Sequence, residues 1–223
     1  MKSGHLTGQP TARISVSGDR VKRLFDVALA SGLLILFSPV MLICALAIGW
    51  NMGRPILFLQ PRIGRGGAIF TVYKFRTMLP PTTPNGRQLS DAERITRLGN
   101  CLRRSHFDEV PQLINVLRGE MSLVGPRPLL PQYLERYTAR QARRHEVQPG
   151  ITGWAQIHGA NALSWDEKFE LDVWYVDHRS PLIDLDILGR TALMALMSLV
   201  TRRAEPLTTE FTGSQTTSNG DQR

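Results

Sequence analysis

The feature that most constrains this chain is an apolar run, residues 27–50, that contains no charged side chain. As a helix the run would be about 36 Å long, enough for a hydrocarbon core of about 30 Å. It is too long and too far from the start to be a cleaved signal peptide, and it has no small-residue cleavage site. A soluble core helix of this length normally carries a polar stripe. The sequence therefore predicts a membrane-inserted helix.

Two features suggest how this helix enters the membrane. Ser38 and Pro39 lie at its middle, where proline leaves the Ile35 carbonyl without a donor and Ser38 is expected to bond to the Leu34 carbonyl. A spanning helix should have Lys and Arg concentrated at one end. Here both flanks are basic, with Arg13, Arg20, Lys22 and Arg23 before the run and Arg54, Arg62 and Arg65 after it. We expect residues 21–53 to form a re-entrant helix-break-helix, with a spanning helix as the alternative.

The remaining pattern predicts an α+β fold that is mostly helical. Alternation over residues 55–78 predicts two short strands around a turn, followed by a loop at 79–87. Helices are expected at 91–104, 108–117, 132–147, 165–175 and 182–200, some of them amphipathic and interfacial. The expected organisation is a mobile N-terminus (1–20), the membrane element (21–53), one folded domain (54–203) and a disordered tail (204–223).

Charge and cysteine content narrow the function classes. There are 27 Lys and Arg against 19 Asp and Glu, a formal net charge of +8, which suits anionic lipid, phosphate-bearing substrates or nucleic acid. Cys44 and Cys101 alone exclude a disulfide framework and a structural zinc site. The chain has no P-loop, dinucleotide fingerprint or nucleophile elbow.

Asp108 and Glu109 form an adjacent carboxylate pair before an apolar helical pattern. Such a pair can cap a helix N-terminus, where it favours the macrodipole. It can also hold Mg²⁺ together with phosphate oxygens, and one carboxylate can attack phosphorus as a nucleophile. All three interpretations are open on the pattern alone.

Three cations are candidate phosphate ligands. Arg127 lies between Pro126 and Pro128, so its backbone is restricted and its guanidinium suits bidentate binding. Lys74 and Arg76 are two residues apart on an expected strand, so they share a face. A rigid loop with an incidental arginine and a solvated strand face would give the same patterns.

Five strings together resemble the bacterial sugar transferase family, the monotopic polyprenyl-phosphate phosphoglycosyl transferases. They are KRLFD, the apolar run with Ser-Pro, YKFRTM, RRSHFDEVPQLINVLRGEMSLVGPRP and PGITGWAQ followed by NALSWDEKFELDVWYV. The resemblance covers residues 22–203 and is to the small members, which consist of the catalytic unit.

The resemblance implies roles for individual residues. Ser38 and Pro39 would make the re-entrant break, Asp108 would be the nucleophile, and Glu109 would help to hold Mg²⁺ and the pair. Substrate or phosphate ligands would be Lys74, Arg103, Arg127 and Asp184. The family often has arginine where this chain has Ala160, which leaves the donor sugar open.

The implied reaction transfers a sugar-1-phosphate from a UDP-sugar to polyprenyl phosphate and releases UMP, through a phosphosugar-aspartate intermediate. This would be the first membrane step in assembling an exopolysaccharide, O-antigen or glycoprotein glycan. It places a monotopic enzyme on the cytoplasmic face of the bacterial inner membrane, with membrane lipid and either a second copy or other glycan enzymes as partners. The alternatives are a non-enzymatic membrane scaffold, a basic nucleic-acid-binding protein and a lipid-alcohol phosphotransferase. The resemblance does not favour nucleic acid as a partner.

Overall fold

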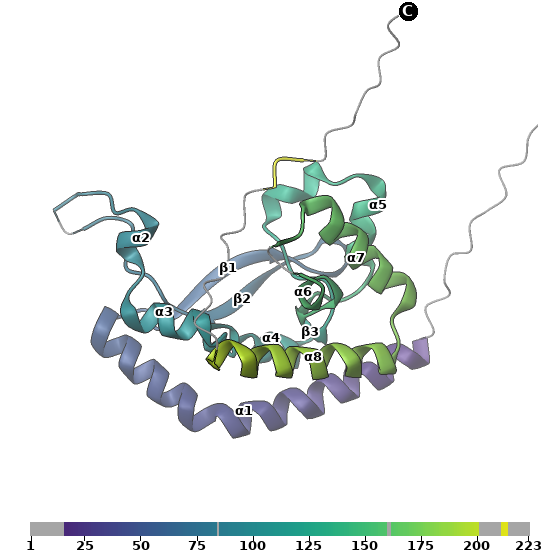
Figure 1. Ribbon diagram of the computed structural model, residues 1–223, viewed down its shortest axis with the longest axis horizontal. Coiled ribbons are helices and arrows are strands. Elements are labelled where there is room, and N and C mark those ends of the chain that lie inside the picture. Colours follow the sequence, from purple (N-terminus) through teal and green to yellow (C-terminus); the bar gives the residue numbers. More distant parts are fainter. Residues whose placement is uncertain (1–15, 84, 160–161, 201–210, 214–223) are drawn as a thin grey trace, which may run out of the picture.

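The computed structural model describes residues 16–83, 85–159, 162–200 and 211–213. Its largest element is α1 (Val16–Met52), a helix of 37 residues. Figure 1 shows α1 bowed beneath the rest of the molecule, with both ends turned toward it. The helix begins before residue 21, so residues 16–20 belong to it, and the rest of the expected mobile N-terminus lies outside the described residues.

The Ser-Pro pair does not interrupt α1. The helix is continuous through Pro39. Ser38 Oγ donates to the Ile35 carbonyl at 2.8 Å, and not to Leu34 as expected. Ile35 is the acceptor that Pro39 leaves without a backbone donor, so the serine replaces the missing hydrogen bond. The predicted helix break is therefore wrong, because the local loss is repaired within the turn.

Polar contacts fasten the N-terminal part of α1 to the folded domain. Lys22 Nζ pairs with Asp184 Oδ2 at 2.6 Å. Asp26, which is 3% exposed, accepts a hydrogen bond from the Leu123 backbone N–H at 3.1 Å. Arg23 donates to the last carbonyls of the neighbouring helix α4 (Gln112–Arg118).

The C-terminal end of α1 is held by the same domain. Arg76 donates to the carbonyl oxygens of Met52 and Gly53 and, at 3.1 Å, of Arg54. A guanidinium there satisfies free helix-end carbonyls and complements the negative end of the helix dipole. Ile48 is buried in a cluster with Phe75 and Leu102.

The predicted hairpin is confirmed. β1 (Leu57–Ile63) pairs antiparallel with β2 (Ile69–Phe75) around the turn η1 (Arg65–Gly67). A second, parallel pair was not predicted: β3 (Ser122–Val124) lies beside β4 (Gly150–Thr152). Three-residue strands in Gly- and Pro-rich sequence show no readable alternation, which is why the pattern missed them.

Of the five predicted helices, three are divided and two are confirmed. Residues 108–117 form the end of η2 (Phe107–Glu109) and most of α4, which begins only at Gln112. Residues 91–104 form α2 (Asp91–Arg94) and α3 (Arg97–Arg104), and residues 132–147 form η3 (Pro131–Arg136), α5 (Ala139–Ala142) and η4 (Arg143–Glu146). Thr96 and Thr138 divide them, because their side chains cap the following segments by accepting backbone N–H groups. After α6 (Trp154–Ile157), helices α7 (Trp165–His178) and α8 (Pro181–Val200) follow the prediction.

Beyond α8 the structure describes residues 211–213, which lie in the segment expected to be a disordered tail. Phe211 is only 2% exposed and packs among Tyr133, Tyr137, Trp165 and Phe169. Apart from residues 211–213, the expected tail of residues 204–223 lies outside the described residues.

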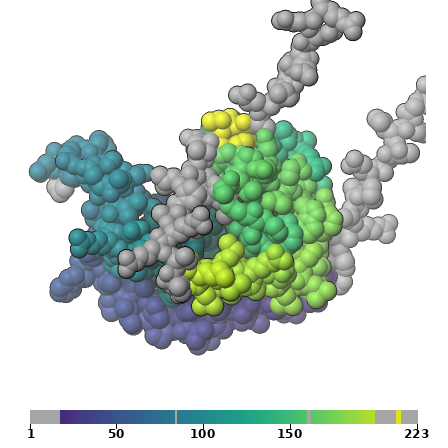
Figure 2. Space-filling view, in the orientation of Figure 1, coloured from purple at the N-terminus to yellow at the C-terminus, as the bar shows by residue number. Residues whose placement is uncertain are grey.

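The outer faces of α1 and α8 are apolar. The exposed large side chains are Val21, Leu24, Phe25, Ile35, Leu36, Val40, Leu42, Ile43, Leu46 and Trp50 on α1, and Leu182, Leu185, Leu193, Met194, Leu196 and Met197 on α8. Figure 2 shows α1 along the lower edge of the molecule, with α8 above it. Within the described residues, α1 is the one helix long and apolar enough to cross a membrane, and its most apolar window is 11% buried. So exposed an apolar helix fits membrane association better than a soluble core.

Candidate active site

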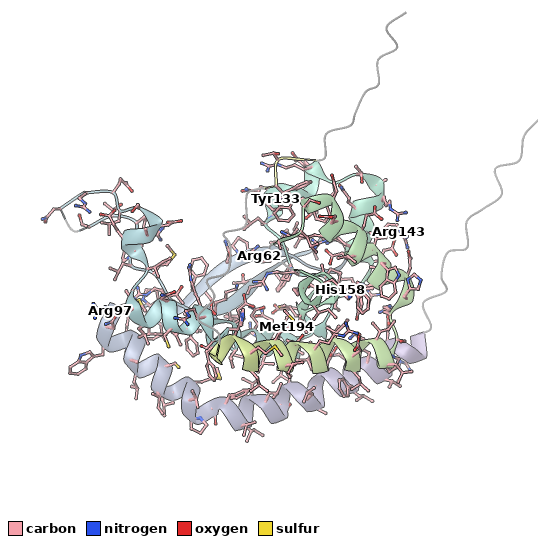
Figure 3. The ribbon with its side chains drawn as sticks, viewed as in Figure 1. Arg62, Arg97, Tyr133, Arg143, His158 and Met194 are labelled. Carbon is pink, nitrogen blue, oxygen red and sulfur yellow. The ribbon has the colours of Figure 1, made fainter. Side chains whose placement is uncertain are left out.

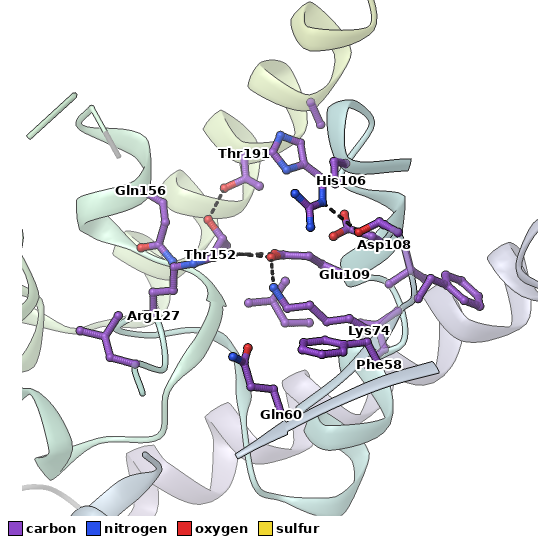
Figure 4. Close-up of a pocket in the computed structure, with 18 of the residues that line it drawn as sticks. Phe58, Gln60, Lys74, His106, Asp108, Glu109, Arg127, Thr152, Gln156 and Thr191 are labelled. Carbon is purple, nitrogen blue, oxygen red and sulfur yellow. Dashed lines mark hydrogen bonds and ion pairs between the residues drawn. The ribbon is translucent and has the colours of Figure 1, made fainter. Parts of the chain in front are cut away.

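A cavity of about 1060 Å³ collects side chains from the hairpin, the region between α3 and α4, and the segment after β3. Figure 4 shows Lys74, Asp108, Glu109 and Arg127 in one part of it. Its wall also includes apolar residues of the two longest helices, namely Leu33 and Phe37 of α1 and Leu188, Met194 and Ala195 of α8. The cavity thus joins a charged cluster to the apolar side of the molecule.

The carboxylate pair lies in a short 3₁₀ turn, η2 (Phe107–Glu109). His106, the preceding residue, has a φ of 56°, a left-handed conformation that few non-glycine residues adopt. Neither η2 nor the following α4 has a side-chain cap hydrogen bond at its N-cap residue. Asp108 and Glu109 line the cavity, so the geometry does not support a simple capping role.

Glu109 holds two of the predicted cations. Its Oε1 atom lies 2.6 Å from Lys74 Nζ and 2.5 Å from Arg127 NH2, and Oε2 lies 3.3 Å from Arg127 NH1. Burial by itself would raise the pKa of Glu109, but Arg127 and Lys74 outweigh it and hold that pKa well below its ordinary value. Glu109 is therefore ionised and orients both cations.

Asp108 is perturbed in the opposite direction. Burial, reinforced by the negative charge of Glu109, raises the pKa of Asp108 to about 6, although Lys74 and Arg103 act against the rise. Two adjacent carboxyl groups with pKa values moved apart indicate different chemical roles. Both carboxylates are desolvated, but only at Asp108 do the neighbouring cations fail to outweigh burial, and a less stabilised carboxylate suits a nucleophile.

Arg103 reaches the site from α3. Its Nε donates to Thr77 Oγ1 at 2.9 Å, and it lines the cavity with Asp108. The position of α3 depends on Gly99, because a Cβ there would lie 1.9 Å from the Thr77 carbonyl oxygen. Close packing of backbone against backbone thus places Arg103.

We expect Gly99→Ala to be strongly destabilising and to lower activity, because two backbone segments must separate and displace Thr77. Overpacking typically costs about 1–3 kcal/mol. The matched control is Gly189→Ala in α8, where a Cβ would meet nothing within 4 Å. That change should be neutral or stabilising by up to about 1 kcal/mol. Thermal unfolding measures both, and equal melting temperatures for the two variants would contradict the packing argument.

Two predicted ligands have other contacts. Asp184 pairs with Lys22 and accepts from the Tyr175 hydroxyl at 2.7 Å, and it is not among the residues that line the cavity. It ties α8 to α1 and α7.

Arg76 lines the cavity, but its guanidinium donates to carbonyl oxygens at the end of α1. Its contacts therefore do not indicate the expected pairing with Lys74 at a phosphate. Ser38 and Pro39 lie in α1, also outside the cavity lining, and Ala160 lies outside the described residues.

Arg62 lies near the site, which sequence reasoning missed, because Arg62 was named only among the basic residues that follow the apolar run. It donates to the Pro128 carbonyl at 3.2 Å and to Gln60 Oε1 at 2.6 Å. Burial, assisted by the charge of Arg127, lowers its pKa to about 10. Figure 3 labels Arg62 near the hairpin, below Tyr133 in that view. Strand alternation from Gln60 would have placed Arg62 on the same face.

The carboxylate pair is the metal candidate. Within the part of the chain that the structure describes, no three His, Cys, Asp or Glu residues gather as ligands. Mg²⁺ is often held by one or two carboxylates with substrate phosphates and water. Asp108 suits it better than Glu109, whose oxygens already bind Lys74 and Arg127.

These features define a class of site: two adjacent, partly buried carboxylates and several cations in one cavity that reaches the apolar helices α1 and α8. Cations gathered in this way suit the chemistry of phosphate groups. The sequence model of the family described as bacterial sugar transferase matches residues 17–205. The chain belongs to this family and is a sugar transferase.

Individual relatives agree with this assignment. The chain is 51% identical, over 87% of its length and 96% of the relative, to the uncharacterized sugar transferase EpsL of Bacillus subtilis. It is 40% identical, over 82% of its length and 72% of the relative, to the UDP-glucose:undecaprenyl-phosphate glucose-1-phosphate transferase of Caulobacter vibrioides. It is 39% identical, over 77% of its length and 42% of the relative, to the UDP-N-acetylgalactosamine-undecaprenyl-phosphate N-acetylgalactosaminephosphotransferase of Aeromonas hydrophila.

Proposed function

We propose that this protein transfers a sugar-1-phosphate from a UDP-sugar to polyprenyl phosphate and releases UMP. The observation that carries the proposal is the single cavity shared by the Asp108–Glu109 pair, the cations and the apolar walls of α1 and α8. A diphosphate donor needs the charged part, and a lipid phosphate acceptor needs access from the apolar part. The two named undecaprenyl-phosphate relatives support the same reaction.

In the proposed first step, an Asp108 carboxylate oxygen attacks the phosphorus that bears the sugar. A bond forms between that oxygen and phosphorus, the bond to the bridging oxygen breaks, and UMP leaves with that electron pair. In the second step an oxygen of the polyprenyl phosphate attacks the same phosphorus and releases the Asp108 carboxylate. Arg127, Lys74 and Arg103 stabilise the negative charge on the transferring group.

Magnesium fits this proposal at Asp108, whose desolvated carboxylate shares the cavity with the site expected for the donor phosphates. When bound, Mg²⁺ would supply positive charge that neutralises the diphosphate. Glu109 keeps the separate task of holding Lys74 and Arg127 in place.

The attachment of α1 supports a monotopic topology. Its 37 residues correspond to about 55 Å of straight helix, yet residues near both ends bind the same folded domain. A helix crossing the bilayer would carry one of these contacts to the opposite side. A bent helix lying in one leaflet keeps both, with the domain on the cytoplasmic face of the inner membrane, where UDP-sugars are available. A second copy of the chain and other glycan enzymes remain predicted partners.

The function is tested with purified protein, undecaprenyl phosphate and a panel of UDP-sugars labelled in the sugar. We expect a lipid-linked phosphosugar and UMP in equal amounts from at least one donor, such as UDP-glucose or UDP-N-acetylgalactosamine. Arg140→Lys, a change in an exposed ion pair with Glu170, is the control that should retain full activity. Release of UDP in place of UMP would indicate simple glycosyl transfer, and no product with any donor would reject the proposal.

A further inference from the structure

The backbone of Arg127 has a buried arginine as its partner. Arg144 NH2 donates to the Arg127 carbonyl oxygen at 2.7 Å, and the whole Arg144 residue is 3% exposed. Arg144 belongs to η4. In the sequence it follows Arg127, whereas the carboxylate pair precedes Arg127. The sequence pattern did not select it, since it is one of several arginines in residues 136–144.

Asp172 of α7 fixes the orientation of Arg144. Its Oδ2 atom lies 3.0 Å from Arg144 Nε and 2.8 Å from Arg144 NH2, and the two side chains are 2% and 4% exposed. Arg144 also lies over the rings of Phe169 and Tyr137. A buried ion pair repays its desolvation cost poorly as a source of stability. In this pair Arg144 NH2 also donates to one backbone carbonyl beside the site, that of Arg127.

That carbonyl matters because it belongs to the residue that reaches Glu109. Pro126 and Pro128 restrict their own φ angles, and Pro128 confines Arg127 to extended conformations. This still leaves a range of φ and ψ at Arg127, so the direction of its carbonyl is narrowed but not fixed. Arg144 holds that carbonyl, and Arg62 holds the next one, that of Pro128, at 3.2 Å. Both peptide planes are thus anchored by guanidinium groups, while the Arg127 side chain points into the cavity.

We propose that Arg144, oriented by Asp172, is a positioning residue that aims Arg127 at the diphosphate of the donor. The inference rests on the proposed function, in which Arg127 binds that diphosphate. Arg144 acts through the Arg127 backbone and has no direct part in the reaction. Lysine cannot replace it, because a single ammonium does not reproduce the planar fork that spans Asp172 and the carbonyl.

The chain offers a matched control one helical turn away. Arg140 and Glu170 join α5 to α7, next to the pair that joins η4 to α7. Their NH2–Oε2 distance is 2.6 Å, but their side chains are 64% and 53% exposed. The two ion pairs therefore connect the same part of the molecule. They differ in burial and in the contact with Arg127.

The test compares Asp172→Asn and Arg144→Lys with Glu170→Gln and Arg140→Lys in the full-length protein. UDP affinity is measured by calorimetry, and KM and kcat are measured for the UDP-sugar, all below the melting temperature of each variant. We expect both buried-pair variants to lose UDP affinity and to raise KM by about 10- to 100-fold, the scale of a misplaced binding group. The two control variants should match the wild type.

A purely structural role would lower the melting temperature and leave the constants of the folded fraction unchanged. If a folded Arg144→Lys variant binds UDP as tightly as the wild type, the inference is overturned. This test remains decisive if Asp172→Asn does not fold. A double-mutant cycle adds a second criterion: once Arg127 is replaced by Ala, Arg144→Lys should cause no further loss of UDP affinity, and a fully additive loss would contradict the inference. If wild-type protein binds no UDP, or Arg127→Ala leaves UDP affinity unchanged, the proposed function fails instead.

Discussion

Asp108→Asn is expected to abolish turnover and at the same time to make the folded protein more stable above pH 6. The pKa of Asp108 is raised to about 6 from an ordinary value of 3.8, because burial and Glu109 disfavour its charged form. Below about pH 4 the side chain is protonated in both the folded and unfolded states, so the substitution changes little. Above pH 6 it is ionised in both states, and the buried charge lowers the free energy of unfolding by about 3 kcal/mol for a shift of this size. Asparagine removes that charge, so the variant is more stable there.

Glu109→Gln should abolish or nearly abolish turnover with the opposite effect on stability. The pKa of Glu109 is held below its ordinary value by Arg127 and Lys74, against the effect of burial. Its stabilisation is therefore present above the ordinary glutamate pKa and is lost as the pH falls through the lowered one. At neutral pH the glutamine variant leaves Lys74 and Arg127 without their carboxylate. The loss is smaller than the roughly 3–5 kcal/mol of a fully buried pair, because the Arg127 side chain is 46% exposed and screened by solvent.

The measurement is thermal unfolding of wild type, Asp108→Asn and Glu109→Gln between pH 4 and 8, together with the transfer assay. Asp186→Asn, which removes half of an exposed ion pair with Arg190, should leave stability and activity near those of the wild type. Changes of the same sign at pH 8 for the two adjacent carboxylates would show that their electrostatic environments do not differ as described. Full activity of Asp108→Asn would eliminate Asp108 as the nucleophile.

The second large effect concerns the topology of α1. In a background of Cys44→Ala and Cys101→Ser, which removes both free cysteines, single cysteines are placed by Arg20→Cys and Asn51→Cys near the two ends of α1. Both positions are exposed. Because both ends of α1 are bound to one domain, we expect an impermeant maleimide to label neither in intact cells and both in inside-out vesicles.

Leu36→Cys, at a position of α1 that is 66% exposed, reports the part of the helix expected to face lipid. It should resist the aqueous reagent in both preparations and react after detergent is added. Labelling of one end in intact cells and of the other end only in inverted vesicles would demonstrate a spanning helix. That outcome would require the contacts of Lys22 with Asp184 and of Arg76 with Met52 to be absent in the membrane.

By itself the sequence determined the features that arise from near neighbours in the chain. The charge-free run predicts the apolar helix, alternation predicts the hairpin, and helical spacing predicts α7 and α8. The same level of pattern singled out Asp108, Glu109 and Arg127 as candidates. Each of these follows from repeats of two or about four residues, or from adjacent side chains, which a linear pattern records directly.

Only the tertiary structure decided which of these residues meet. Lys74 and Arg127 converge on Glu109 from 35 and 18 residues away, Arg76 caps α1, and Asp184 fastens α1 and α7. Arg144 reaches the Arg127 carbonyl across 17 residues. Whether a cation binds a phosphate, a carboxylate or a carbonyl depends on its burial and its neighbours in space. Packing between distant segments sets both, and no local period encodes it.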